Sequence, residues 1–485
     1  MPAPVATRHR PLLFIVGLFF LYFSNGSHAW AVAPWVALPC LLLVTRTLRP
    51  WATYVLMAVS FGVVTQASLW HFATQDARQL LHYVPLAAGL LFGLPYALDT
   101  AAFGRKKPPG WQTLVFPLAY TCLEFAVGSL NPYGTMGMLP YSQLGFLALA
   151  QLASVTGIWG ITFLLTWFGS VVAYEAAQYL AKGHLGQVGA VYLAFFGVVV
   201  LFGSWRLSQK NPPGGARVAS LHVQDRAGLS RLWTLRQTNP AAFRVTSDSV
   251  IHQLLLATRQ QAQAGAQVVV WSEVSPPIYA ADEPRLLDSL KRLTRETGVM
   301  LVASPYVYET APKKDQNKLW LIDPAGNLVF THLKYGGNII EGCEQGNGQL
   351  QAANTPLGKV SAVICWDGDF PHAMRQVSKL DAGLLLIPAA DWQAIDPLHT
   401  MVAQFRGIEN GCSVVRQTLS GRSVMADPYG RVITQMDHFA TTRWFMQGQL
   451  PTQRIPTLYG LLGDWFAWLC VAGLALVVWL SYKIY

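Results

Sequence analysis

The chain has 485 residues, of which 52% are hydrophobic and only 12% charged, and its formal net charge is +10. A soluble domain carries about 25% charged residues, so this composition excludes a chain that lies wholly in water. No nucleic-acid motif and no basic patch interleaved with aromatic residues accompanies the positive charge, so no nucleic-acid partner is expected. We expect much of the chain to lie in lipid, with its basic residues setting the orientation.

Apolar residues before about position 205 come in runs of about 17–20, the length that spans a bilayer. Glu124 lies inside one such run, and we favour a structural hydrogen-bonding role for it over a place on a substrate path. The predicted domains are a seven-span bundle over 1–207, an extracytoplasmic domain over 208–456 and a C-terminal span over 457–485. The eight predicted spans are 11–25, 28–45, 51–69, 82–99, 112–130, 157–177, 188–204 and 461–481.

Basic residues flank these spans mainly on one side, which the positive-inside rule makes the cytoplasmic side. Both termini are then cytoplasmic, and the segment from about 205 to 458 lies outside. In a bacterium, this predicts a multi-pass protein of the inner membrane whose segment from about 205 to 458 lies in the periplasm. The residues behind this prediction are Arg8, Arg10, Arg46, Arg49, Arg105, Lys106, Lys107, Lys182 and Lys483, with Arg78 as the exception.

The segment from about 205 to 458 alternates strand-like and helix-like stretches, which predicts one α/β domain of about 250 residues, large enough for a full core. Its predicted strands begin at Ala216, end at Glu273, cover 299–307, form a hairpin over 318–334 that turns at 323–327, end at Cys365, and cover 382–392 and parts of 412–433. Its predicted helices cover about 243–264, 284–297 and 397–410, and Gly298 ends the second of them.

Glu273, Lys334 and Cys365 each end a strand-like run, which is where α/β folds place their chemistry. A thiolate is the attacking form of cysteine, and a free thiol is mostly protonated at neutral pH. A carboxylate takes up its proton, and an ammonium favours both the thiolate and the oxyanion that forms on attack. Taken singly, each residue reads as a core or surface residue, so the set rather than any member predicts a nucleophilic site.

The order and surroundings of these residues resemble the carbon–nitrogen hydrolase (nitrilase) superfamily. This resemblance implies an αββα sandwich in which Glu273 is the general base, Lys334 stabilises the oxyanion and Cys365 is the nucleophile. The stretches that carry it are "VVVWSE" at 268–273, "HLK" at 332–334, "VICWDGDFP" at 363–371, "DAGLLLIPAADW" at 381–392, "RGIENG" at 406–411 and "GRSVMADPYGRV" at 421–432.

A nitrilase-like domain between membrane spans is similar to the apolipoprotein N-acyltransferase family. Further stretches carry this resemblance: "NPYGTMGMLPYSQ" at 131–143, "ASVTGIWGITFL" at 153–164 and "TLYGLLGDWFAW" at 457–468. It implies a phospholipid acyl donor, a diacylglyceryl lipoprotein as acceptor and a cysteine thioester between them. No cofactor and no metal site are expected, and the protein is expected to be a monomer.

Some residues depart from the family pattern around the implied substrate pocket. Ser272 replaces the proline before the base glutamate, and Trp366 and Asp367 replace a Tyr–Glu pair. After Lys334 the stretch "YGGNIIEGCEQGNG" offers Glu341, or alternatively Glu344, as a second site acid. The text around Cys365 is closer to soluble amidases, so a membrane-anchored amidase remains an alternative, as does a non-catalytic lipoprotein-binding scaffold.

Overall fold

The computed structural model describes residues 7–70, 80–103, 109–337 and 341–483, so Arg78, Arg105, Lys106 and Lys107 lie outside the described residues. The chain forms two compact units. The first comprises Met1–Leu130, Gly137–Gln209 and Leu462–Tyr485, and the second comprises Asn131–Met136 and Lys210–Leu461. The short segment Asn131–Met136, which lies between two apolar helices in the sequence, therefore packs with the second unit.

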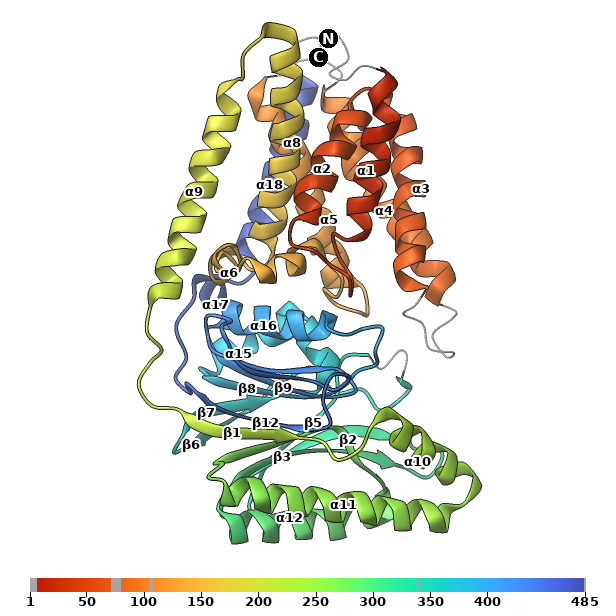
Figure 1. Cartoon of the computed structure of the whole chain (residues 1–485), viewed down its shortest axis with the longest axis vertical. Coiled ribbons are helices and arrows are strands. Elements are labelled where there is room, and N and C mark those ends of the chain that lie inside the picture. Colours follow the sequence, from red (N-terminus) through yellow and green to blue (C-terminus); the bar gives the residue numbers. More distant parts are fainter. Residues whose placement is uncertain (1–6, 71–79, 104–108, 338–340, 484–485) are drawn as a thin grey trace. The chain divides into compact units, whose positions relative to one another are not determined.

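Apolar helices make up the first unit (Figure 1). Among the described residues, five stretches are long and apolar enough to cross a bilayer: Pro50–Leu69 (α3), Tyr83–Phe103 within α4 (Leu80–Phe103), Gly110–Leu130 with α5 (Val115–Leu130), Trp159–Lys182 (α8) and Gln187–Ser208 (α9). Shorter apolar helices are α1 (Arg10–Tyr22), α2 (Ala33–Thr45), α6 (Leu147–Ala150), α7 (Ala153–Thr156) and α18 (Trp465–Lys483). The chain is a membrane protein with several apolar helices, and the total of eight spans stays a prediction.

Side chains on the outer faces of these helices are strongly apolar. Four apolar side chains on these long helices are each more than 60% exposed: Val63, Leu193, Val198 and Leu201. A large exposed apolar surface is unfavourable in water and fits a lipid environment. The outer faces of α3 and α9 therefore suit contact with acyl chains.

Buried polar contacts join the helices inside this unit. The Arg46 guanidinium after α2 forms an ion pair with Asp99 on α4 at 2.8 Å and donates to the Ser170 carbonyl on α8 at 2.9 Å. Glu124 is buried, and its two carboxylate oxygens accept from the Leu139 amide at 2.9 Å and the Thr162 hydroxyl at 2.5 Å. These contacts give Glu124 the structural role that the sequence favoured.

The second unit is a sandwich of two six-stranded sheets (Figure 1). The first sheet has the order β12-β1-β2-β3-β4-β5, from Phe445–Leu450, Ala216–Leu221, Val268–Tyr279, Met300–Tyr308, Gln316–Ile322 and Leu328–Leu333. The second has the order β11-β10-β9-β8-β7-β6, from Val432–Asp437, Arg422–Ala426, Ser413–Leu419, Leu384–Ala390, Gly358–Ala362 and Ala352–Thr355. Parallel strands lie at the centre of each sheet, with antiparallel strands on both sides.

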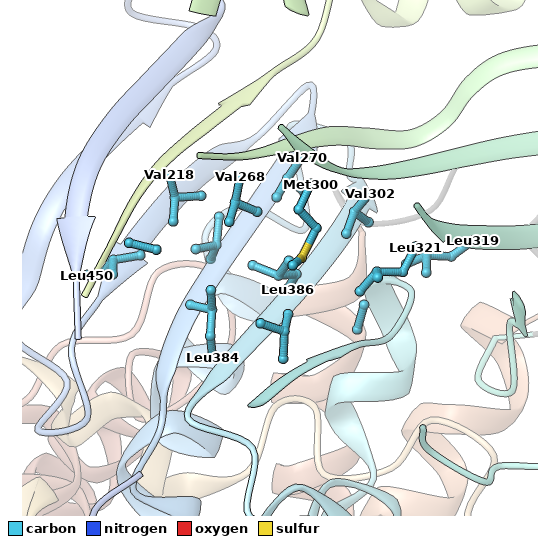
Figure 2. Packing of buried hydrophobic residues seen from close by; sticks show 14 of the residues in the cluster. Val218, Val268, Val270, Met300, Val302, Leu319, Leu321, Leu384, Leu386 and Leu450 are labelled. Atoms are coloured by element: carbon cyan, nitrogen blue, oxygen red, sulfur yellow. The ribbon is translucent and has the colours of Figure 1, made fainter. Parts of the chain in front are cut away.

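Apolar side chains from the inner faces of both sheets form the core of the sandwich (Figure 2). Val218, Val268 and Val302 of the first sheet pack with Leu384 and Leu386 of the second, and all five are fully buried. The alternate residues Val269 and Leu301 point outward and pack with the helices of the first sheet, as the two-residue period of a strand requires. Helices α10 (Arg226–Thr238), α11 (Pro240–Gln263) and α12 (Glu283–Thr297) cover the first sheet, and α14 (Pro371–Met374), α15 (Gln376–Lys379) and α16 (Leu398–Asn410) cover the second.

The predicted αββα sandwich is confirmed, but two strand ends differ from the prediction. Strand β2 continues past Glu273 to Tyr279, and β7 ends at Ala362, three residues before Cys365. Helix α10 and strand β12 were not predicted. Helix α12 does end at Gly298, which adopts the left-handed conformation (φ 70°) that glycine accepts without cost.

Candidate active site

Glu273 lies at an irregularity within β2. Here the strand register shifts, so that both Glu273 and Ser275 pair with Ser304 of β3. The next residue, Val274, has a φ of 56°, which is a genuine outlier for a β-branched side chain. A bulge re-aims a side chain that would otherwise follow the strand's alternation. This one accompanies a glutamate that is only 2% exposed, inside the sandwich.

Cys365 begins the short 3-10 turn η6 (Cys365–Asp369), just after β7. Its φ of 44° lies in the left-handed region, which costs a non-glycine residue about 1–3 kcal/mol. Such strain persists where the surrounding structure enforces it, and it is concentrated at functional sites. The thiol is 6% exposed. The sharp turn from strand to η6, rather than the strand end itself, sets the direction of the thiol.

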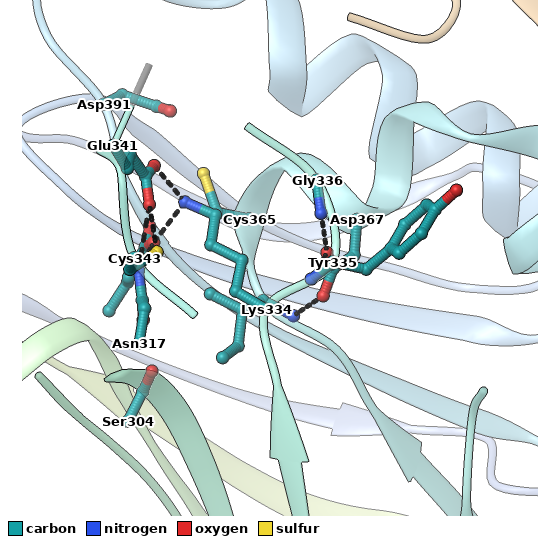
Figure 3. A network of polar contacts seen from close by, with 12 residues as sticks. Ser304, Asn317, Lys334, Tyr335, Gly336, Glu341, Cys343, Cys365, Asp367 and Asp391 are labelled. Atoms are coloured by element: carbon teal, nitrogen blue, oxygen red, sulfur yellow. Dashed lines mark hydrogen bonds and ion pairs between the residues drawn. The ribbon is translucent and has the colours of Figure 1, made fainter. Parts of the chain in front are cut away.

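Lys334 directly follows β5 and lies between two carboxylates (Figure 3). Its ammonium donates to Glu273 Oε1 at 2.6 Å and also contacts Glu341. The side-chain amide of Asn317 on β4 donates to Glu273 Oε1 at 2.7 Å and to Glu341 Oε2 at 3.3 Å. Glu273, Lys334 and Glu341 are therefore held in one hydrogen-bonded cluster. Asn317 also belongs to this cluster, although the sequence did not predict it.

Charges around Cys365 set the protonation state of the cluster. Burial would lower the pKa of Lys334, but Glu273 and Glu341 raise it more, so the side chain stays an ammonium. Burial and the Glu273 carboxylate raise the pKa of the Cys365 thiol well above its usual value, and the Lys334 ammonium opposes this rise. The cluster therefore holds a protonated thiol near an acidic side chain and a cation, and a thiol in this state has to lose its proton before it can act as a nucleophile.

Asp367 fixes the turn η6 to the residues that follow Lys334 (Figure 3). One of its oxygens accepts from the amides of Tyr335 and Gly336 at 2.8 and 2.7 Å. The other accepts from the Ile364 amide at 2.9 Å and lies 2.7 Å from His332 Nε2. Because protein groups engage both of its carboxylate oxygens, Asp367 is suited to positioning Lys334 against Cys365.

The other predicted site residues take different places. Trp366 donates through Nε1 to the Tyr133 carbonyl at 3.3 Å and packs against the ring of Tyr133, so it joins the segment Asn131–Met136 to the turn η6. Glu344 accepts from the Gln316 amide at 2.7 Å, away from Lys334. Of the two candidate second acids, Glu341 is the one in contact with Lys334.

Two more charged residues approach Cys365. Arg416 on β9 lies with one nitrogen 3.8 Å from the Cys365 sulfur, and it forms an ion pair with Asp391, which follows β8. Neither residue was predicted from the sequence to belong to the site. A signal was present, since a charge within the buried strand "CSVVRQTL" needs a partner and Asp391 ends the neighbouring parallel strand. Among the described residues, no group of three or more His, Cys, Asp or Glu side chains is arranged to hold a metal ion.

Comparisons with known proteins agree for both parts of the chain. A family model for carbon-nitrogen hydrolases matches residues 233–455. A second, for the apolipoprotein N-acyltransferase N-terminal domain, matches residues 17–171. The two models thus fall on the sandwich and on the apolar helices respectively.

Similar proteins match over most of the chain. An apolipoprotein N-acyltransferase of Geobacter metallireducens is 25% identical over 78% of this chain and 76% of its own length. One of Gloeobacter violaceus is 27% identical over 91% of this chain and 88% of its own length. Among solved structures, an amidase from Nesterenkonia sp. is 18% identical, with a TM-score of 0.39, over 50% of this chain and 94% of its own.

Proposed function

From the premise that the chain belongs to the apolipoprotein N-acyltransferase family of the carbon–nitrogen hydrolase superfamily, we propose that it acylates lipoproteins. The donor is a phospholipid, and the acceptor is the α-amino group of the lipid-bearing N-terminal cysteine of a lipoprotein. Glu273, Lys334 and Cys365 carry the chemistry, and the catalytic domain faces the periplasm of a bacterial inner membrane. The observation that carries this proposal over a soluble amidase activity is that apolar helices matching the acyltransferase N-terminal domain precede the sandwich on the same chain.

The first half-reaction transfers the acyl group to the enzyme. Glu273 takes the proton of the Cys365 thiol, and the thiolate attacks the ester carbonyl carbon of the phospholipid. The Lys334 ammonium stabilises the oxyanion, while Glu341 and Asn317 hold the cluster in place. When the intermediate collapses, the ester C–O bond breaks and the lysophospholipid oxygen takes the proton back from Glu273. A thioester on Cys365 remains.

The second half-reaction transfers the acyl group to the lipoprotein. An α-amino group has a pKa near 7.7–8.0, so a useful fraction is neutral and nucleophilic at neutral pH. The amine nitrogen attacks the thioester carbonyl, and Glu273 accepts the proton that the nitrogen loses. The C–S bond then breaks, and the sulfur recovers a proton from Glu273. Low water access to the thioester favours transfer over hydrolysis.

A product assay tests this proposal. The full-length protein in detergent micelles is incubated with phospholipid and a synthetic peptide that carries a diacylglyceryl N-terminal cysteine. We expect mass spectrometry to find the peptide heavier by one acyl group, together with one lysophospholipid per transfer. A second peptide with an acetylated N-terminus is the control, because its nitrogen is no longer nucleophilic, and it should stay unmodified.

The amidase alternative predicts a different result in the same assay. An amidase releases ammonia from small amides and leaves both peptides unchanged. Ammonia release without acylation of the lipidated peptide would contradict the proposed acyl transfer and favour the amidase. If neither acylated peptide nor ammonia is formed, the result favours the non-catalytic scaffold.

A further inference from the structure

Arg416 and Asp391 form an ion pair beside the nucleophile, and the two half-reactions above leave the pair without a role. The Arg416 guanidinium donates to the two oxygens of Asp391 at 2.6 and 2.9 Å. The nitrogen that makes the longer of these bonds also lies 3.8 Å from the sulfur of Cys365. The two side chains are only 1% and 2% exposed. The pair is therefore sealed in the same buried space as the thiol.

Contacts from several elements fix the direction of the guanidinium. Arg416 also donates a third hydrogen bond, to the hydroxyl of Thr400 on α16 at 3.1 Å. The Asp391 amide donates to the Leu419 carbonyl at 2.8 Å and to the Thr418 hydroxyl at 3.1 Å. A guanidinium is a rigid planar fork, so two bonds to Asp391 and one to Thr400 determine where the second N–H of the nitrogen nearest Cys365 points. That group points toward sulfur.

Stability alone does not account for this arrangement. Removing two charges from water is expensive, and replacing a buried ion pair with well-packed apolar residues is often neutral or stabilising. A buried charge pair next to a reactive thiol is, however, a common way to tune reactivity. Besides burial, the carboxylates of Glu273 and Asp391 raise the pKa of the Cys365 thiol, and the cations Lys334 and Arg416 lower it.

We propose that Arg416 is a catalytic residue that stabilises the Cys365 thiolate through its N–H group, and that Asp391 is a positioning residue that orients Arg416 and offsets its charge. This inference rests on Cys365 being the nucleophile of the proposed acyl transfer. Negative charge reaches the sulfur twice in each cycle, first when the thiol proton passes to Glu273 and again when the C–S bond of the thioester breaks. Arg416 is placed to stabilise the negative sulfur in both states, whereas Lys334 stabilises the negative charge on the carbonyl oxygen.

The pair predicts opposite effects from its two members. In Arg416→Gln, the Asp391 carboxylate is left uncompensated, so Cys365 should ionise at higher pH. Asp391→Asn preserves the size of the side chain but removes its negative charge. The positive charge of Arg416 then acts on the Cys365 sulfur without an opposing carboxylate, so Cys365 should ionise at lower pH. One charge within about 4–6 Å moves a pKa by about 1–3 units, so alkylation at neutral pH should change about tenfold in each direction. A purely structural ion pair would move both variants the same way.

The test measures alkylation of Cys365 by iodoacetamide across a pH series, in the detergent-solubilised full-length protein without lipid. Peptide mass spectrometry reads the modification at Cys365 itself. The matched control is the buried pair Arg406 and Glu409 on α16, whose side chains are 0% and 1% exposed. Arg406→Gln and Glu409→Gln should leave the pH dependence of Cys365 alkylation unchanged, even where they lower the melting temperature of the protein.

Equal shifts in one direction, or shifts below twofold, in Arg416→Gln and Asp391→Asn would overturn the inference. If Arg416→Gln does not fold, Asp391→Asn decides alone, and unchanged or slower alkylation overturns the inference. The readout needs no acyl donor. Opposite shifts in the two variants, together with a wild-type protein that acylates no peptide, would therefore contradict the proposed function and leave the role of Arg416 standing.

Discussion

Cys365→Ala is expected to abolish acyl transfer to the lipidated peptide, because alanine offers no nucleophile to form the thioester. Cys365→Ser should retain at most a slow transfer, since a hydroxyl is far harder to ionise than a thiol and depends more heavily on Glu273. Both substitutions change few atoms in the turn η6, so the sandwich should stay folded. The rate of peptide acylation, followed by mass spectrometry, measures the effect.

Cys412 provides the matched control for this variant. It is a second fully buried cysteine of the same unit and packs in the apolar cluster beneath α16. Cys412→Ala should therefore keep acylation while losing some stability. Cys343 is a poorer control, because its sulfur lies 3.8 Å from Glu341. Acylation that persists in Cys365→Ala would move the nucleophile to another residue.

Lys334→Met is expected to slow the formation of the thioester by about 10²–10³-fold, the usual effect of removing one oxyanion donor. Methionine keeps much of the length of the lysine side chain but supplies no charge and no donor. Phospholipid should still bind, so the loss should appear in the rate of acylation rather than in the donor concentration needed for half-maximal rate. Single-turnover acylation with excess phospholipid measures it.

Two further variants separate chemistry from folding. Lys334→Met leaves Glu273 and Glu341 facing each other without a cation, and an unpaired buried charge is strongly destabilising. Lys334→Met combined with Glu341→Gln removes one of these charges and should fold better while acylating no faster. Lys318→Met is the matched control, since Lys318 lies on the neighbouring strand β4, is also buried and pairs with Glu283 at 2.8 Å. Near-normal acylation in Lys334→Met would remove Lys334 from the site.

Patterns that lie along the chain predicted much of the fold. The apolar runs located the long helices, and the periodicity of 284–297 with Gly298 located α12. The turn at 323–327 was predicted by its sequence, and the Asp323 amide does donate to the Asn327 carbonyl at 3.0 Å. Local signals of this kind depend on neighbours a few residues apart, so they survive without knowledge of the tertiary structure.

Features that depend on distant partners could not be read in this way. The irregularity at Glu273 arises where β2 pairs with β3, and nothing in "VVVWSEVSPP" marks the left-handed Val274. Asn317 reaches the site only because β4 lies beside β5, the strand that Lys334 directly follows. The sequence therefore predicted three candidate reactive residues, while strand pairing determines what holds them in place.

The accumulation of a thioester on the wild-type protein tests the central claim most directly. The full-length protein is incubated with phospholipid in the absence of any amine acceptor, and its intact mass is measured. We expect the mass to rise by one fatty acyl group that neutral hydroxylamine removes, and we expect the lipidated peptide to discharge it as acylated product. An unchanged protein mass, with lysophospholipid absent from the mixture, would contradict the account.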